Sequence, residues 1–114
     1  MYSHVIANLG SEWLQSEVES LSEINNGLCA DFANAVANID GIYEIVGVYD
    51  SEDLNVLLGG YSPEFESAVS QGAVGHTALY REGKFYDAEC STGVSCFEKL
   101  PINIRVLNCI LERN

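Results

Sequence analysis

The chain has 114 residues, which is enough for one hydrophobic core, and we expect a single domain over residues 1–114. Hydrophobic residues make up 47% of it, which excludes a disordered chain. No apolar run approaches the roughly 20 residues of a membrane span, so we expect no contact with a membrane. The formal net charge is −12, from 17 acidic and 5 basic residues, and a surface this acidic repels nucleic acid.

The N-terminal residues 1–5 contain no Lys or Arg ahead of their apolar side chains, unlike a secretory signal peptide. We therefore expect a cytoplasmic protein whose 4 cysteines stay reduced. The acidic charge is typical of a protein kept in solution or of a salt-adapted host. The alternative is a surface that engages a basic partner or imitates nucleic acid.

Two helices are predicted in the first third of the chain. The first begins after Ser11, a good N-cap, and ends at the helix-breaking residues 25–27. The second covers Leu28–Ile39, where four alanines allow close packing on a sheet. The first helix carries an apolar stripe at helical spacing, formed by Trp13, Leu14, Val18, Leu21 and Ile24.

The middle of the chain alternates between strand and helix signals. β-Branched and aromatic residues predict a strand over Ile42–Tyr49. Residues 54–58 fit either a short strand or a turn of helix, and the glycine pair at 59–60 ends that element. The Ser-Pro sequence at 62–63 is typical of a helix start, and we expect this helix to reach about Gln71.

A hairpin follows, with strands over Ala73–Tyr80 and Lys84–Ala88 around a three-residue turn at 81–83. The alternating apolar residues of the segment 102–106 predict a last strand, and a helix that starts at Pro101 is the alternative. Helices come first and an antiparallel sheet after them. The predicted fold class is therefore α+β, with N-terminal helices packed on a small antiparallel sheet.

Cys29 lies at the first turn of the second predicted helix, just after the Gly27 that ends the first. Unpaired N–H groups at a helix N-terminus favour a negative sulfur, so they lower the thiol pKa below its usual value of about 8.5. The same N–H groups are typical of an oxyanion hole. We interpret Cys29 as a nucleophile, and the alternative is a small buried core residue.

His76 lies on the first strand of the predicted hairpin, and Asp87 lies on the second. With a three-residue turn, position 76 faces roughly position 88, so Asp87 is one place away and within reach of a ring nitrogen. The other nitrogen is then left for the sulfur. This arrangement indicates a nucleophile, a base and an orienter. The alternatives are a structural histidine and an aspartate that closes the hairpin.

Cys90 and Cys96 flank Gly93 and would suit a disulfide or half of a metal site. A zinc ion would need two further ligands. The remaining candidates are Cys29, Cys109, His4 and His76. We expect ordinary cysteines, with no bound metal and no cofactor.

The segment from residue 27 to residue 88 resembles the papain-like and transglutaminase-like thiol hydrolase superfamily. The resemblance rests on the helical sequence Cys29-Ala30-Asp31-Phe32-Ala33, a following strand, Gly75-His76 on a later strand, and Asp87 after a hairpin. It implies a central antiparallel sheet with the cysteine helix packed against it, and acyl transfer through a thioester. By this resemblance Cys29 is the nucleophile, His76 the general base and acid, and Asp87 the orienter.

Other positions bear on the cleft that the resemblance implies. Papain-like enzymes use a glutamine shortly before the cysteine for the oxyanion, and no glutamine closely precedes Cys29. Asn25 and Asn26 are the candidates in its place. Tyr61, beside a glycine pair, is a candidate for lining the cleft. Ala78 stands two residues after the histidine, where the transglutaminase-like branch usually carries an aromatic residue.

We therefore expect a small cysteine hydrolase or acyl transferase of peptidase, amidase or deamidase type, acting on an amide bond of a protein or peptide. A basic substrate would suit the acidic surface. The alternative is a catalytically inactive, acidic binding module or inhibitor of the same fold, including a nucleic-acid mimic. A mimic needs its carboxylates on one face, whereas an enzyme has them scattered or framing the cleft.

Overall fold

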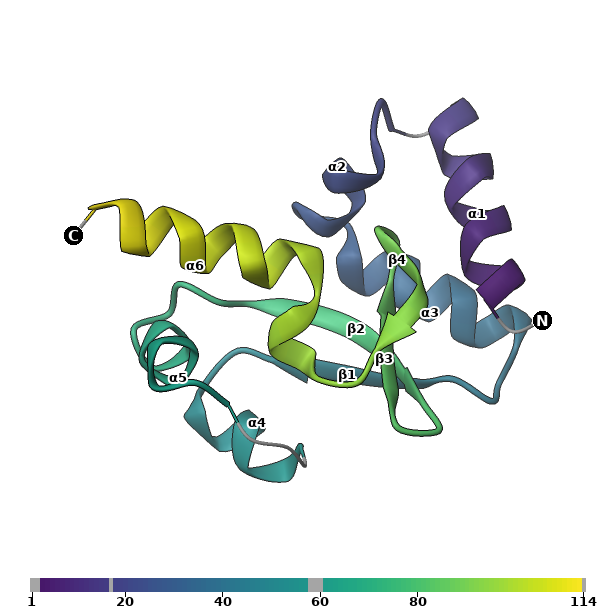
Figure 1. Ribbon diagram of the computed structural model, residues 1–114. Coiled ribbons are helices and arrows are strands. Elements are labelled where there is room, and N and C mark those ends of the chain that lie inside the picture. The colour runs from purple at the N-terminus through teal and green to yellow at the C-terminus, as the bar shows by residue number, and fades with distance from the viewer. Residues whose placement is uncertain (1–2, 17, 58–60, 114) are drawn as a thin grey trace.

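The computed structural model describes residues 3–16, 18–57 and 61–113, which form a mixed α+β fold as the sequence predicts (Figure 1). Three helices precede the sheet, two more follow its first strand, and a 13-residue helix follows its last strand. In chain order the elements are α1 (Ser3–Ser16), α2 (Leu21–Asn25), α3 (Cys29–Ile39), β1 (Glu44–Val48), α4 (Ser51–Val56), α5 (Pro63–Ser70), β2 (His76–Arg81), β3 (Lys84–Asp87), β4 (Cys90–Val94), the 3₁₀ turn η1 (Phe97–Lys99) and α6 (Pro101–Arg113).

The four described strands form one antiparallel sheet in the order β1-β2-β3-β4. Successive residues along a strand point to opposite faces of a sheet. Leu79 and Tyr86 pair in register and belong to one buried cluster, whereas Ala78 and Phe85 belong to another. The sheet is therefore a middle layer with a hydrophobic core on each face.

Helices α1, α2 and α3 pack in the first of these clusters, and α4, α5, η1 and α6 pack in the second. In the first layer, the ring of Phe32 meets Trp13 of α1 edge-on, with centroids 5.2 Å apart. In the second layer, Phe97 of η1 contacts Phe65 and Phe85. Over the described parts of the chain, no helix is both long and apolar enough to cross a membrane.

The N-terminal helix differs from the sequence prediction at both ends. α1 spans Ser3–Ser16, so Ser11 lies inside the helix and is not its N-cap. The upstream residues Ile6 and Leu9 are buried, and they continue the apolar stripe at helical spacing. A separate short helix begins at Leu21, so the prediction of one continuous helix is wrong.

The C-terminal segment is a helix, so the predicted strand over residues 102–106 is wrong. α6 begins at Pro101, whose fixed φ favours the first helical turn, and the carbonyl of Leu100 accepts the first N–H bonds. Helical spacing lets Val106 and Ile110 contact the second core together. The fourth strand of the sheet is β4, which the sequence analysis did not predict.

The central elements follow the sequence prediction more closely. α3, β1 and α5 lie within their predicted ranges, and Ser62 caps α5 by accepting the Phe65 N–H at 3.2 Å. The segment after β1 is helical, which is one of its two predicted alternatives. Its N-cap Asp50 exchanges reciprocal hydrogen bonds with Asp53 in a capping box. The glycine pair at 59–60 lies outside the described residues.

The hairpin between β2 and β3 turns over two residues, not the predicted three. Arg81 pairs directly with Lys84. Between them, Glu82 and Gly83 both have positive φ, at 48° and 82°, as a type I′ turn requires. The true register of the hairpin is therefore shifted by one residue from the predicted one.

This shift decides which face of the sheet carries Asp87, because a one-residue slip moves a side chain to the opposite face. The predicted register would place Asp87 opposite Thr77. Continuing the observed register by one position places Asp87 opposite Ala78, which shares its face with His76. The two-residue turn thus brings the histidine and the aspartate to the same side.

Candidate active site

Cys29 is the first residue of α3, and the backbone just before it explains this placement. Gly27 has a φ of +126°, which L side chains rarely adopt, and it lets the chain turn between α2 and α3. The Leu28 N–H donates to the Ile24 carbonyl at 2.9 Å, which closes the turn. The Cys29 thiol is free and partly exposed.

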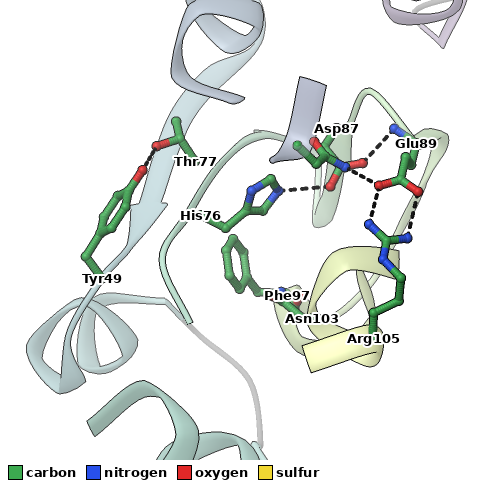
Figure 2. Close-up of polar contacts among 9 residues, drawn as sticks. Tyr49, His76, Thr77, Asp87, Glu89, Phe97, Asn103 and Arg105 are labelled. Atoms are coloured by element: carbon green, nitrogen blue, oxygen red, sulfur yellow. Dashed lines mark hydrogen bonds and ion pairs between the residues drawn. The ribbon is translucent and has the colours of Figure 1, made fainter. Parts of the chain in front are cut away.

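His76 and Asp87 form a buried pair, with 1% and 2% of their surfaces exposed. Nε2 of His76 lies 2.9 Å from Oδ2 of Asp87 (Figure 2). The imidazole packs near Phe97 of η1, with ring centroids 6.0 Å apart. Because Nε2 is committed to Asp87, Nδ1 is the nitrogen that remains. It is buried and has no hydrogen-bond partner among the described residues.

The Cys29 thiol interacts with the His76 side chain, and this interaction is the largest cause of an altered thiol pKa. It lowers the pKa of Cys29 from 9.0 to about 7, although burial of the sulfur acts in the opposite direction. Backbone N–H groups of Thr77 and Ala30 also favour the thiolate. The hydrogen-bonding interaction between the sulfur and the His76 ring lowers the thiol pKa more than the charge of the ring does, and both act in the same direction.

The pKa of His76 is raised in turn, from 6.5 to about 9. Burial opposes the charged form and lowers this pKa, but the bond to Asp87 and the interaction with Cys29 outweigh burial. Cys29 therefore loses its proton at a lower pH than His76 does. In the free side chains the order is the reverse, since the imidazolium loses its proton before the thiol. Between about pH 7 and 9 the pair is a thiolate beside an imidazolium.

A cavity of about 440 Å³ opens beside this pair, and its lining includes Cys29 and His76. Tyr49 forms part of its wall. The Tyr49 ring lies across Gly47 and Gly75, where an added Cβ would come within 3.0 and 3.1 Å of it. Its hydroxyl bonds with the hydroxyl of Thr77 (Figure 2). The two glycines therefore make room for an aromatic wall next to the site.

Both asparagine candidates line this cavity, but they differ in how far they are exposed. Asn26 is exposed at the end of α2. Asn25 is 3% exposed, and its Nδ2 donates to Oε1 of Glu89 at 2.8 Å. One of the two N–H donors of the Asn25 side chain is thus engaged by a carboxylate.

Tyr61 lies outside the lining of the cavity and packs in the second core. Its ring stacks on Phe65 with centroids 5.7 Å apart, and burial raises the pKa of its phenol. The structure therefore brings Cys29, His76 and Asp87 together and places both asparagines beside them. It places Tyr61 elsewhere.

Sequence reasoning missed two further cavity residues. Asn103 is 1% exposed and donates its Nδ2 to the Phe97 carbonyl at 2.7 Å, which ties α6 to η1. Its signal was a polar residue on the apolar side of a helix, but the segment had been predicted as a strand. The sequence predicts Tyr49 only as part of a strand, and its signal is an aromatic residue two positions after Gly47.

Comparisons of the chain with known protein families, curated proteins and solved structures found no match. Within the part of the chain that the structure describes, no three His, Cys, Asp or Glu side chains are grouped to hold a metal ion. A function must therefore be inferred from the geometry and electrostatics of the site.

Proposed function

We propose that the chain is a cysteine-dependent hydrolase or acyl transferase with a papain-like or transglutaminase-like core, which acts on an amide bond through a thioester on Cys29. One observation carries this proposal. A thiol with a pKa of about 7 lies beside an imidazole that a buried carboxylate holds at 2.9 Å. Burial raises a thiol pKa and is the largest cause of the raised pKa of Cys90, so a lowered pKa marks Cys29 as different from a packing residue.

The first half of the proposed reaction forms the thioester. The Cys29 thiolate attacks the carbonyl carbon of the amide, and negative charge moves to the carbonyl oxygen. The His76 imidazolium gives the proton on Nδ1 to the leaving nitrogen as the C–N bond breaks. The products are a free amine, an acyl group bonded to Cys29, and a neutral His76.

The second half releases the acyl group. Neutral His76 accepts a proton from water or from an amine as that molecule attacks the thioester carbonyl. The C–S bond breaks, the sulfur leaves as a thiolate, and the proton stays on His76, which restores the ion pair. Water produces a carboxylic acid and an amine produces a new amide, so one site supports hydrolysis and transfer.

Asp87 orients the ring in this scheme. By accepting a hydrogen bond from Nε2, its carboxylate leaves Nδ1 on the side of the sulfur, and its charge favours the imidazolium. Backbone N–H groups near the start of α3, including that of Ala30, supply the positive field that a thiolate and an oxyanion need.

Alkylation with iodoacetamide, followed by mass-spectrometric mapping, tests the nucleophile. At about pH 6 a thiol with a pKa of about 7 should react ahead of Cys90, Cys96 and Cys109. A peptide with an activated thioester at its carboxyl end should then acylate Cys29, and the Cys29→Ser variant should remain unmodified. If Cys29 reacted no faster than the exposed Cys109, it would not be a nucleophile. A reactive Cys29 without acylation would favour the inactive binding module.

A further inference from the structure

Both carboxylate oxygens of Asp87 are occupied, each by a different partner. Oδ2 binds Nε2 of His76, and Oδ1 accepts the backbone N–H of Glu89 at 3.0 Å. Glu89 belongs to the turn between Asp87 and Cys90, which pair across β3 and β4. The direction in which the carboxylate faces His76 therefore depends on where this turn holds Glu89.

The Glu89 side chain is itself held by three donors from two helices. Arg105 of α6 forms a bidentate pair with it, with Nη1 at 2.7 Å from Oε2 and Nη2 at 2.6 Å from Oε1. Asn25 of α2 donates to Oε1 at 2.8 Å. Figure 2 shows Glu89 between Asp87 and Arg105. Arg105 is the largest cause that lowers the pKa of Glu89, so the pair stays charged near neutral pH.

This arrangement connects both sides of the candidate site. Asn25 ends α2, just ahead of the Gly27 turn that leads into Cys29. Glu89 lies two residues after Asp87, the last residue of β3. The Glu89 carboxylate thus links three segments: α2, which precedes Cys29, the turn that follows Asp87, and α6.

We propose that Arg105 is a positioning residue for this site: through Glu89 it holds the turn that aims Asp87 at His76, and it thereby sets the reactivity of Cys29. This inference rests on the proposed function of Cys29 as a nucleophile. Arg105 touches no reacting atom, since its guanidinium bonds are made to Glu89.

A positioning role and a simple charge effect change the His76 pKa in opposite directions. A guanidinium that acted only as a positive charge would disfavour the imidazolium, so its removal would raise the His76 pKa. A guanidinium that holds Asp87 in place strengthens the Nε2–Oδ2 bond, so its removal lowers that pKa. The other ionisable groups near His76 are Cys29 of α3, Asp87 of β3, Glu89 of the turn and, beside Phe97 on η1, Glu98, which bonds to Ser62.

The experiment compares Arg105→Met and Arg105→Lys with a matched control, Arg81→Met. Arg81 lies at the far end of the hairpin, 3.5 Å from Glu82, so the control removes an equal charge away from the site. NMR titration of the His76 ring gives its pKa. The pH profile of Cys29 alkylation is measured on the same samples, and circular dichroism reports folding.

In Arg105→Met the His76 pKa should fall from about 9 towards 6.5. Alkylation of Cys29 at about pH 6 should slow roughly threefold, which corresponds to a thiol pKa higher by about 1 after allowing for the stronger nucleophile. Arg105→Lys keeps the charge but loses the planar fork of the guanidinium, so its His76 pKa and its Cys29 alkylation rate should lie between those of Arg105→Met and the unmodified protein. Both values in Arg81→Met should match those of the unmodified protein.

An unchanged or raised His76 pKa in folded Arg105→Met overturns the positioning role. If the methionine variant does not fold, the His76 pKa of Arg105→Lys decides the question. A lowered pKa supports the positioning role, and an unchanged or raised pKa overturns it. A different failure marks the proposed function: if Cys29 of the unmodified protein shows no preferential reactivity at about pH 6, the nucleophile assignment is wrong whatever Arg105 does.

Discussion

Replacing His76 by glutamine removes the imidazolium charge and keeps a donor beside Asp87. The glutamine amide nitrogen comes close to the position of Nε2, so the buried carboxylate is not left unpaired. The interaction with His76 is the largest cause that lowers the Cys29 pKa, and burial of the sulfur acts against it. Without the imidazolium, we expect the Cys29 pKa to return from about 7 to near 9.0.

The size of the effect follows from these two pKa values. At pH 7 the thiolate fraction falls from about one half to about 1%, a loss of about 50-fold. The thiolate of higher pKa is the better nucleophile, with a Brønsted coefficient of about 0.4–0.5. A pKa higher by about 2 therefore makes each thiolate react roughly tenfold faster, which offsets part of the loss. The net loss is about fivefold at pH 7, the two rates become equal near about pH 8, and the variant reacts faster above that pH.

The assay is the second-order rate of iodoacetamide alkylation at Cys29 from about pH 5 to 10, measured by mass spectrometry on folded protein. Cys90 provides an internal control in each sample, because burial raises its pKa and His76 is not among the causes. The crossing of the two profiles is the decisive feature, since a general loss of folding would lower or raise the rate at every pH. A folded variant with an unchanged midpoint near pH 7 would refute the ion pair.

Three further results are expected. Asp87→Asn should keep the fold but lower the pKa of His76 in an NMR titration, because an amide has no charge to favour the imidazolium; an unchanged pKa would contradict the orienter role. The kcat/KM for an amide substrate should rise through about pH 7 as Cys29 ionises and fall through about pH 9 as His76 loses the proton that the leaving amine needs, so a profile without the alkaline limb would contradict the acid role. Gly93→Ala should lower the free energy of unfolding by roughly 2–4 kcal/mol, because the new Cβ would come within 2.7 Å of an aromatic ring at a φ of +83°. Gly72→Ala, at a φ of +79° in open space, should cost only about 1–2 kcal/mol, and equal losses in thermal unfolding would contradict the steric argument.

The features of the site that depend on nearby residues were predictable from the sequence. Cys29 follows a glycine with positive φ and opens an alanine-rich helix, and both signals lie within a few residues of it. The proximity of His76 to Asp87 was predicted from a turn of the wrong length. Glu82-Gly83 is a less obvious type I′ pair than Asn-Gly or Asp-Gly, so the sequence alone does not indicate a two-residue turn.

Features that depend on distant contacts were not predictable in this way. The segment 102–106 alternates like a strand, and its overlap with a helical pattern is resolved only by packing against the second core. Tertiary packing also extended α1 upstream of Ser11, since Ile6 and Leu9 are buried against other helices. The bond between Asn25 and Glu89 joins residues 64 positions apart, and no local pattern indicates it.

Cys29 and His76 belong to different layers of the molecule. Cys29 begins a helix of the first layer, whereas His76 packs near Phe97 in the second. Proteins open locally and in cooperative parts, and an opening that separated these layers would part the sulfur from the ring. A nascent or half-folded chain would then carry only an ordinary thiol. The lowered thiol pKa is therefore a property of the assembled fold, since it needs both layers in place.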